Sequence, residues 1–253
     1  HSKNRHLHSD VDLALVARQT PGFSGAQLSN LMNEAAIRTM CRRDVSTTMN
    51  DINDALERVT VGLSRTSHNI PSDVRERIAI HEAGHAVVGS VLDTFDDVVR
   101  VTIAPRTSGA GGLTAFVTNE SRGTEGLFTH DYLSAKLCVL LAGRAAEAYM
   151  LGRETISVGS GNDIQRAKSI AEQMVVEWGM GSGLFPSRDA RDAVMRDRVD
   201  REMEALVDDA YTSALSIVGS RRSAILTLTR HLLDTSDTVD GDTVRRILRD
   251  ASS

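Results

Sequence analysis

The fold of this chain is decided by one stretch, Ile78-Ala79-Ile80-His81-Glu82-Ala83-Gly84-His85-Ala86-Val87, which carries the pattern H-E-x-x-H. Just before it, Pro71-Ser72-Asp73 is a helix-start signal, and no proline interrupts residues 74–92. The sequence therefore predicts a helix over Val74–Leu92. Because residues four apart lie on one face of a helix, His81 and His85 can direct their rings at a single metal ion.

The residue types in this pattern suit zinc chemistry. Zn²⁺ favours imidazole ligands, and catalytic zinc sites leave one coordination position for water. Glu82 follows His81 directly, so its carboxylate can take a proton from that water. The alternative is a pair of core histidines beside a coincidental glutamate, since both histidines lie on an apolar stripe with Ile78 and Val88. The mechanistic spacing favours the metal site.

Composition excludes several classes of protein. The chain has 253 residues, 41% of them hydrophobic, and a formal charge of −5 without clustered basic residues, so nucleic acid is not an expected partner. Cys41 and Cys138 match no metal or redox spacing, which predicts an intracellular, reducing setting. No apolar run approaches the roughly 20 residues of a membrane span and no signal peptide opens the chain, so the chain itself is expected to be soluble.

Residues 1–61 are predicted to form a small helical module. A first helix is expected from Asp10 to Ala17, a second from the capping-box pair Ser24 and Gln27, and a third from a cap near Thr48. The apolar sides of the second and third helices are assigned to Leu28, Leu31, Ala35, Ile37, Ile52, Leu56 and Val59. About fifty residues give a thin core, so this module is expected to pack on something larger.

Residues 62–72 are polar and turn-rich and are predicted to be a linker, followed by a second domain over residues 73–253. There the period changes to two, with alternation at Val99, Val101 and Ile103 and again at Leu113, Ala115 and Val117. Two such runs around a turn at residues 105–112 predict a β-hairpin. Its edge can hold an extended peptide by main-chain hydrogen bonds, and a hairpin that only covers the core is an equal alternative.

The rest of the chain predicts helices, so the fold class is mainly α with a small β-hairpin or sheet. Helices are expected over residues 130–150, 162–178, 198–218, 224–233 and 242–250, the first two closed by Gly152 and Gly179. In the third of these helices the inward residues are predicted to be Met203, Leu206, Ala210 and Leu215. The charged faces of these helices are interpreted as solvent-exposed surface.

Two acidic residues compete to be the third zinc ligand. Glu147 lies on the long helix, where glutamate on a second helix is a common solution. Asp163 lies in the first turn of the next helix, on one face with Ala167, Ile170 and Met174. A carboxylate directed at an apolar layer needs a partner, and a metal ion would supply one. The alternative for Asp163 is an exposed acid at a helix N-terminus. These residues alone leave the choice open.

The order of motifs resembles the FtsH family of ATP-dependent zinc metalloproteases over most of the chain. The opening stretch looks like the protease signature of that family, and two further blocks follow in the family's order, Leu141-Ala142-Gly143-Arg144-Ala145-Ala146-Glu147 and Ser157-Val158-Gly159-Ser160-Gly161-Asn162-Asp163. The resemblance implies one Zn²⁺ per chain, held by His81, His85 and Asp163. Glu82 would be the general base, and Glu147 a residue behind the ligands.

The first module is similar to the helical lid of AAA ATPases, through Thr20-Pro21-Gly22-Phe23-Ser24-Gly25-Ala26-Gln27-Leu28 and the residues that follow. Here the resemblance implies adenine contacts at His1, Gly25 and Ala26. The chain contains no G-x-x-x-x-G-K-[ST] phosphate loop, so ATP is expected to act through a core outside it, in a homo-hexameric ring. A membrane anchor would lie upstream; without one the parent is expected in the cytoplasm. One departure is a shortened segment after Gly179, which affects loop contacts near the site.

These observations predict a zinc endopeptidase that degrades unfolded or translocated polypeptides and is driven by an upstream AAA ATPase core. A non-catalytic assembly or chaperone module, with a structural zinc or none, is the first alternative. A nucleotide-responsive lid that couples subunits of a ring is the second. Metal content and casein hydrolysis with and without a chelator separate the enzyme from the first alternative, and nucleotide binding by the isolated chain would favour the second.

Overall fold

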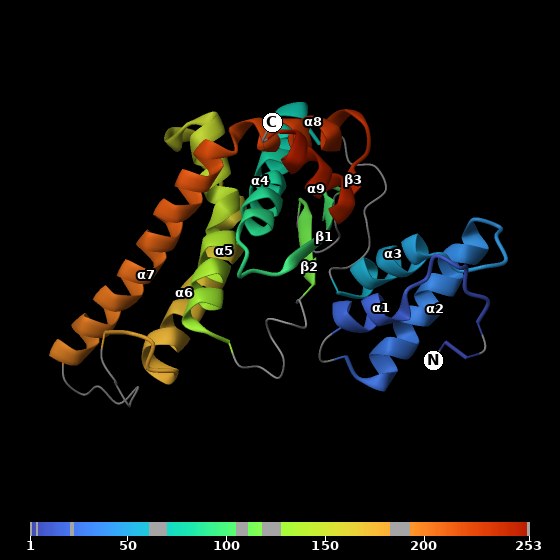
Figure 1. The fold of residues 1–253 in the computed structure, drawn as a ribbon, viewed down its shortest axis with the longest axis horizontal. Coiled ribbons are helices and arrows are strands. Elements are labelled where there is room, and N and C mark those ends of the chain that lie inside the picture. Colours follow the sequence, from blue (N-terminus) through green and yellow to red (C-terminus); the bar gives the residue numbers. More distant parts are fainter. Residues whose placement is uncertain are drawn as a thin grey trace. The chain divides into compact units, whose positions relative to one another are not determined.

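A computed structural model describes residues 2–3, 5–20, 23–60, 70–104, 111–117, 128–182 and 193–251 (Figure 1). The chain divides into two compact units, His1–Asn69 with Ala104–Ala110 and Ile70–Ile103 with Gly111–Ser253. Within the described residues the first unit is helical and the second combines helices with one three-stranded sheet. The predicted fold class, mainly α with a small sheet, is confirmed.

The first unit consists of α1 (Leu13–Gln19), α2 (Gly25–Cys41) and α3 (Met49–Thr60). Its core is formed by Val16, Leu31, Met32, Ala35, Ile52 and Ala55. The predicted capping box is confirmed, because the Ser24 hydroxyl accepts from the Gln27 N–H and the Gln27 side chain accepts from the Ser24 N–H. Together these contacts satisfy amide donors that the first turn of α2 leaves unpaired.

Two details of the predicted first unit are wrong. The first helix begins after Asp12, whose carboxylate accepts from the Ala14 and Leu15 amides, because Asp10 accepts from the Met49 amide at the start of α3 instead. Ile37, assigned to the inner side of α2, is 49% exposed. An isoleucine does not by itself mark the buried face, because surface helices also carry single apolar residues.

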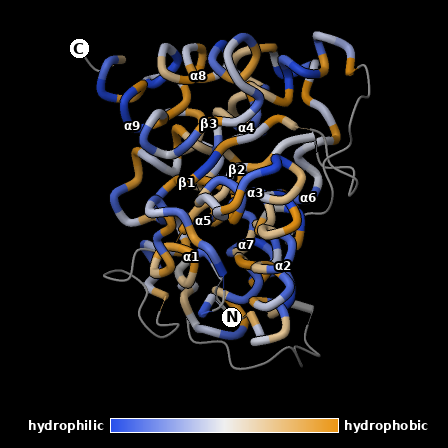
Figure 2. Tube along the Cα trace, turned by 90° about the vertical axis from the view of Figure 1, so that its right-hand side faces the viewer, coloured by the Kyte–Doolittle hydropathy of each residue, from blue (hydrophilic) through white to orange (hydrophobic). Residues whose placement is uncertain are grey.

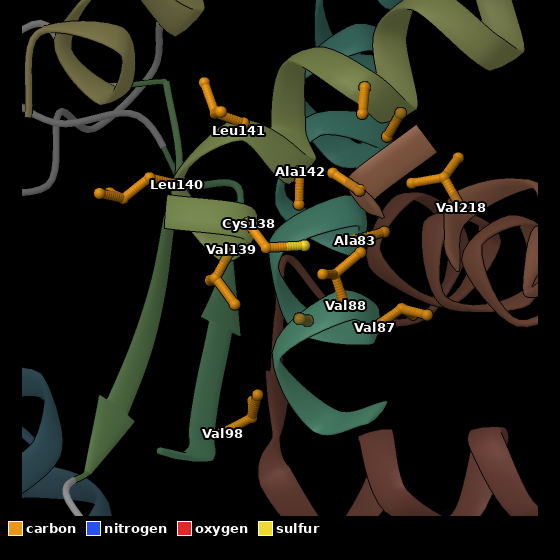
Figure 3. Close-up of a cluster of buried hydrophobic side chains, with 14 of the residues drawn as sticks. Ala83, Val87, Val88, Val98, Cys138, Val139, Leu140, Leu141, Ala142 and Val218 are labelled. Carbon is orange, nitrogen blue, oxygen red and sulfur yellow. The ribbon is translucent and has the colours of Figure 1, made fainter. Parts of the chain in front are cut away.

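The second unit is built around two long helices that pack together, α4 (Ser72–Val91) and α5 (His130–Leu151). Figure 3 shows Ala83, Val87 and Val88 of α4 beside Cys138 and Ala142 of α5. The two helices approach closely at Gly84, where an added Cβ would lie 2.7 Å from the carbonyl oxygen of Ala142. Because α4 is surrounded by packed elements, most of its second half is buried on every side, Glu82 and His85 included.

Shorter helices complete this unit. After α5 come two 3-10 turns, η2 (Arg153–Thr155) and η3 (Val158–Ser160), then α6 (Gly161–Glu172) with a π-helical turn, η4 (Gln173–Glu177). The remaining helices are α7 (Ala193–Ser220), α8 (Arg222–Asp234) and α9 (Gly241–Asp250). The predicted stops are confirmed: Gly152 and Gly179 have φ of 97° and 62°, a conformation that glycine adopts without strain.

Of the inward residues predicted for α7, Ala210 is buried, whereas Met203, Leu206 and Leu215 are half-buried. Hydrophobic and hydrophilic residues alternate along most helices of the chain (Figure 2). Among the described helices, none combines the length and the apolar composition that a membrane crossing requires.

The sheet has the order β2-β1-β3 and contains β1 (Asp97–Thr102), β2 (Leu113–Val117) and β3 (Thr238–Asp240). As predicted, β1 and β2 pair antiparallel; the turn expected between them lies mostly outside the described residues. The predicted inner face of β1 is partly wrong. An irregularity in the pairing between Val98 and Arg100 shifts the register, so Val98 is buried and Val99 is not. Such a bulge reverses the alternation on one side of it.

Candidate metal centre

Three of the predicted ligands meet at one point in the second unit: His81 and His85 of α4 and Asp163 of α6. The two histidine Nε2 atoms lie 3.0 Å apart, and the Asp163 Oδ2 lies 3.3 Å from the first and 3.4 Å from the second. Zinc bonds of about 2.0–2.2 Å in a tetrahedron place ligand atoms about 3.3–3.6 Å apart. The two distances to Asp163 fall in this range, and the distance between the histidine nitrogens is slightly shorter. A small separation of the two rings would therefore let these three atoms hold one zinc ion.

The two imidazoles are arranged to face a cation. Their Nε2 atoms point at one another at 3.0 Å, so at most one proton can lie between them. Asp163 brings a negative charge to the same point; its side chain is 18% exposed and does not project into solvent. Burial raises the pKa of Asp163, but hydrogen bonds to His81 and His85 outweigh it and hold this pKa well below its usual range. An anionic carboxylate and two imidazoles that have released the Nε2 proton form a donor set that zinc prefers.

The far sides of both rings are also held. His81 Nδ1 lies 2.8 Å from Oε1 of Glu147, and His85 Nδ1 lies 2.7 Å from the carbonyl oxygen of Val139. Metal-binding histidines commonly donate their other N–H in this way, which fixes the tautomer and the ring orientation. Glycine at position 143 makes room for the rings, because an added Cβ would lie 2.5 Å from the ring of His81.

His81 lies between the two carboxylates that compete as ligands. Glu147 contacts Nδ1 and Asp163 contacts Nε2, so Asp163 shares the side of the ring on which His85 converges. Burial lowers the pKa of His81, but hydrogen bonds to Asp163 and Glu147 raise it to about 10. Glu147 is buried, yet its hydrogen bonds to His81 and Ser157 lower its pKa to about 2. Both acids are thus ionised at neutral pH, on opposite edges of one ring.

Glu82 lies next to the three-residue cluster and is 7% exposed. Its Oε2 accepts a hydrogen bond of 2.7 Å from the Thr114 hydroxyl of β2. Burial raises the pKa of Glu82, and the positive charges of His85 and His81 oppose that rise without cancelling it. Gly112, just before β2, also lies close, because an added Cβ would be 2.7 Å from Cγ of Glu82. A carboxylate with a raised pKa beside a metal site can both accept and return a proton.

The predicted adenine contacts lie elsewhere. Gly25 and Ala26 are exposed in the first turn of α2, in the first unit, and His1 lies outside the described residues. The shortened segment after Gly179 also falls largely outside them, although Ser182 is described and its amide donates to Glu202.

Sequence reasoning missed several residues around the site. Three of them contact the histidine or acidic side chains of the site: Val139 contacts His85, Thr114 contacts Glu82 and Arg77 contacts Glu147. No local sequence pattern indicates these contacts. Gly143 could have been found, because it is the single glycine in the block that ends at Glu147.

Comparisons with known proteins point to a family of zinc peptidases. The model of peptidase family M41 matches residues 68–247, and that of the AAA+ lid domain matches residues 10–54. The chain is 37% identical over 98% of its length to the ATP-dependent zinc metalloprotease FtsH 3 of Synechocystis sp., and 37% over 96% to FTSH 1, chloroplastic, of Oryza sativa subsp. japonica. It is 38% identical over 98% to FtsH 2 of Symbiobacterium thermophilum. The chain spans only 38–43% of the length of these relatives.

Proposed function

This chain belongs to peptidase family M41, and from that premise we propose that it is the peptide-cleaving part of a zinc endopeptidase. The observation that carries the proposal is the convergence of two imidazole nitrogens and one carboxylate oxygen at 3.0–3.4 Å, with an ionisable glutamate beside them. We assign His81, His85 and Asp163 as the ligands of one zinc ion. Glu147 is assigned to support His81 from behind.

When bound, zinc would polarise the scissile carbonyl and lower the pKa of a water molecule to about 7. Glu82 then has the central role among the residues of the chain. Its carboxylate takes one proton from the attacking water and returns it to the amine that leaves when the peptide bond breaks. Burial favours this role because it raises the pKa of Glu82. The pKa of the base is then closer to the pKa of the zinc-bound water that it must deprotonate.

Strand β2 is the proposed platform for the substrate. It is an outer strand in the sheet order β2-β1-β3, and its Thr114 touches Glu82. An extended polypeptide can add to the outer edge of such a strand through main-chain hydrogen bonds, which require no particular side chains. A backbone-reading platform suits a protease that acts on unfolded or translocated polypeptides of varied sequence.

The longer protein is proposed to be a machine driven by ATP. Its parts in this chain would be an AAA lid over residues 1–61, a linker over 62–72 and the peptidase over 73–253. Support comes from the lid match and from relatives named ATP-dependent proteases. Gly25, Ala26 and His1 would contact adenine bound to a core upstream. The whole protein would be a homo-hexamer, with any membrane anchor in an upstream segment.

Replacement of Glu82 by Gln tests this function. The Glu82→Gln variant should keep its zinc, since the amide leaves the three ligands in place, and lose hydrolysis of casein by about 10²–10⁴-fold. Zinc content is measured by atomic absorption and hydrolysis by release of labelled peptides, with and without a chelator. Glu76→Gln, an exposed position on the same helix, is the matched control. Full activity of Glu82→Gln, or activity that a chelator does not affect, would contradict the proposal.

A further inference from the structure

Glu147 is held from two sides by groups that no motif includes. Its Oε2 accepts from Nη1 of Arg77, on α4, and from the backbone N–H of Ser157, each at 3.2 Å. The Glu147 side chain is only 1% exposed, so its negative charge has almost no contact with water. Arg77 therefore supplies a counter-charge that this buried carboxylate needs, since a buried charge without one is costly.

This arrangement decides what His81 can do. With Oε2 occupied by two donors, Oε1 of Glu147 faces Nδ1 of His81 at 2.8 Å. An ionised carboxylate can only accept hydrogen bonds, so Nδ1 must carry the hydrogen of the neutral ring. Nε2 is then left with a lone pair, and it is the atom that faces His85 and Asp163. The Arg77–Glu147 pair thus selects the tautomer that can bind a metal.

Arg77 also contacts the segment that leads to the third ligand. Its Nη1 donates to the carbonyl oxygen of Thr155 at 2.5 Å. Thr155 ends η2, and the chain then runs through Ser157 and η3 into α6, where Asp163 lies in the first turn. One guanidinium therefore joins α4, which bears both histidines, to the carboxylate behind His81 and to the backbone that precedes Asp163.

We propose that Arg77 is a positioning residue of the metal centre: it acts through Glu147 to fix the orientation and tautomer of His81, and through Thr155 to place Asp163. This inference rests on the proposed zinc site. Arg77 itself touches neither the three ligand atoms nor the general base in the described contacts. Its effect should therefore appear in zinc affinity before it appears in anything else.

The test measures the zinc dissociation constant of the 253-residue chain by competition with a chromogenic chelator. Removing a group that supports a ligand typically weakens metal binding by about 10–100-fold, which we expect for Glu147→Gln. Arg77→Met, one contact further out, should weaken it by about 3–10-fold, and Arg77→Lys by less. Because both residues act on His81, the double variant should lose less than the product of the two single losses.

Arg75→Met is the matched control. Arg75 lies on the same helix at similar exposure, 34% against 28%. It pairs with Asp237 and donates to the carbonyl oxygen of Leu233, and neither of these partners belongs to the metal centre. It should lower the unfolding midpoint without changing zinc affinity. Unchanged zinc affinity in Arg77→Met would overturn the positioning role, and multiplicative losses in the double variant would overturn the route through Glu147. If Arg77→Met does not fold, the folded Arg77→Lys variant must still bind zinc more weakly than the parent.

The same titration separates this inference from the proposed function. If the parent chain and the Arg77 variants bind zinc equally well, the protease proposal stands and only the positioning role of Arg77 is overturned. A parent chain that binds no zinc at the three ligands overturns both.

Discussion

Each unit of the chain carries an acidic residue in the first turn of a helix, and the two residues differ in what surrounds them. Asp51 of α3 is 3% exposed and accepts from fixed donors: the Arg42 guanidinium at 2.6 and 2.9 Å, and the amide and hydroxyl of Thr48. Asp163 of α6 faces two imidazole nitrogens at 3.3 and 3.4 Å. Similar positions on a helix therefore serve different chemistry.

The difference lies in whether the partners can release a proton. Arginine and a backbone amide keep their hydrogens at all ordinary pH values, so the environment of Asp51 is closed and structural. An imidazole can release its proton to become a metal ligand, so the environment of Asp163 can exchange protons for a metal ion. A helix-start acid is thus a functional residue only where its partners are themselves ligands.

The largest expected effect comes from removing each carboxylate in turn. Asp163→Asn should weaken zinc binding by more than about 100-fold, beyond the usual range for residues behind the ligands, and abolish hydrolysis. Asp51→Asn should leave zinc affinity unchanged and destabilise the first unit by about 1–3 kcal/mol, because it leaves charged donors without their partner.

Zinc competition and unfolding monitored by circular dichroism measure these two effects. Trp178, the single tryptophan of the chain, lies in the second unit, so its fluorescence reports that unit alone. Equal losses of zinc affinity in both variants would show that the two acids do not differ as described.

The comparison also shows how far the sequence could lead. The H-E-x-x-H spacing and the two later blocks were sufficient to predict the helix of the histidines and to nominate both Glu147 and Asp163. Residue patterns alone could not rank these two acids, since both lie on helices that have an apolar face. Their ranking depends on which edge of the His81 ring each one meets, and that is a property of packing between α4, α5 and α6.

Other features had too weak a local signal. Strand β3 has three residues, too few to show alternation, and it pairs with β1 from far along the chain. The bulge near Val99 moved the buried face of β1 by one residue, which a strict period of two cannot anticipate. Thr114 and Arg77 matter only through side chains that the fold brings to them.

A pH series on the metal-free chain should separate the two units further. The His81 pKa is raised from 6.5 to about 10, so its contribution to stability is complete below pH 6.5 and is lost as pH rises towards 10. The Glu147 pKa is lowered from 4.5 to about 2, so its contribution is complete above pH 4.5 and is lost as pH falls towards 2. The metal-free second unit should therefore be most stable between pH 4.5 and 6.5.

Urea unfolding followed by Trp178 fluorescence, in the presence of a chelator, checks this maximum. With zinc bound, the metal takes the place of the His81 proton, so the alkaline decline should disappear and zinc affinity should rise with pH. The first unit, whose Asp51 pairs with an arginine, should show no decline between pH 6.5 and 10. A metal-free second unit that is equally stable at pH 6 and pH 9 would contradict the assigned role of His81.

The smallest expected effect comes from Thr114→Val, which removes a donor from the base and leaves the ligands untouched. The hydroxyl of Thr114 lowers the pKa of Glu82, so its loss should raise that pKa further and move the acidic limb of the pH–activity profile to higher pH. Activity should fall at acidic pH and approach the parental level as pH rises. The loss at acidic pH should be far smaller than the loss of about 10²–10⁴-fold expected when the base is removed.

Thr102→Val, on the neighbouring strand and bonded to Thr238, is the matched control and should leave the profile in place. A uniform loss at every pH would mean that Thr114 orients the substrate strand and does not tune Glu82, and the pH profile of kcat/KM distinguishes these two roles.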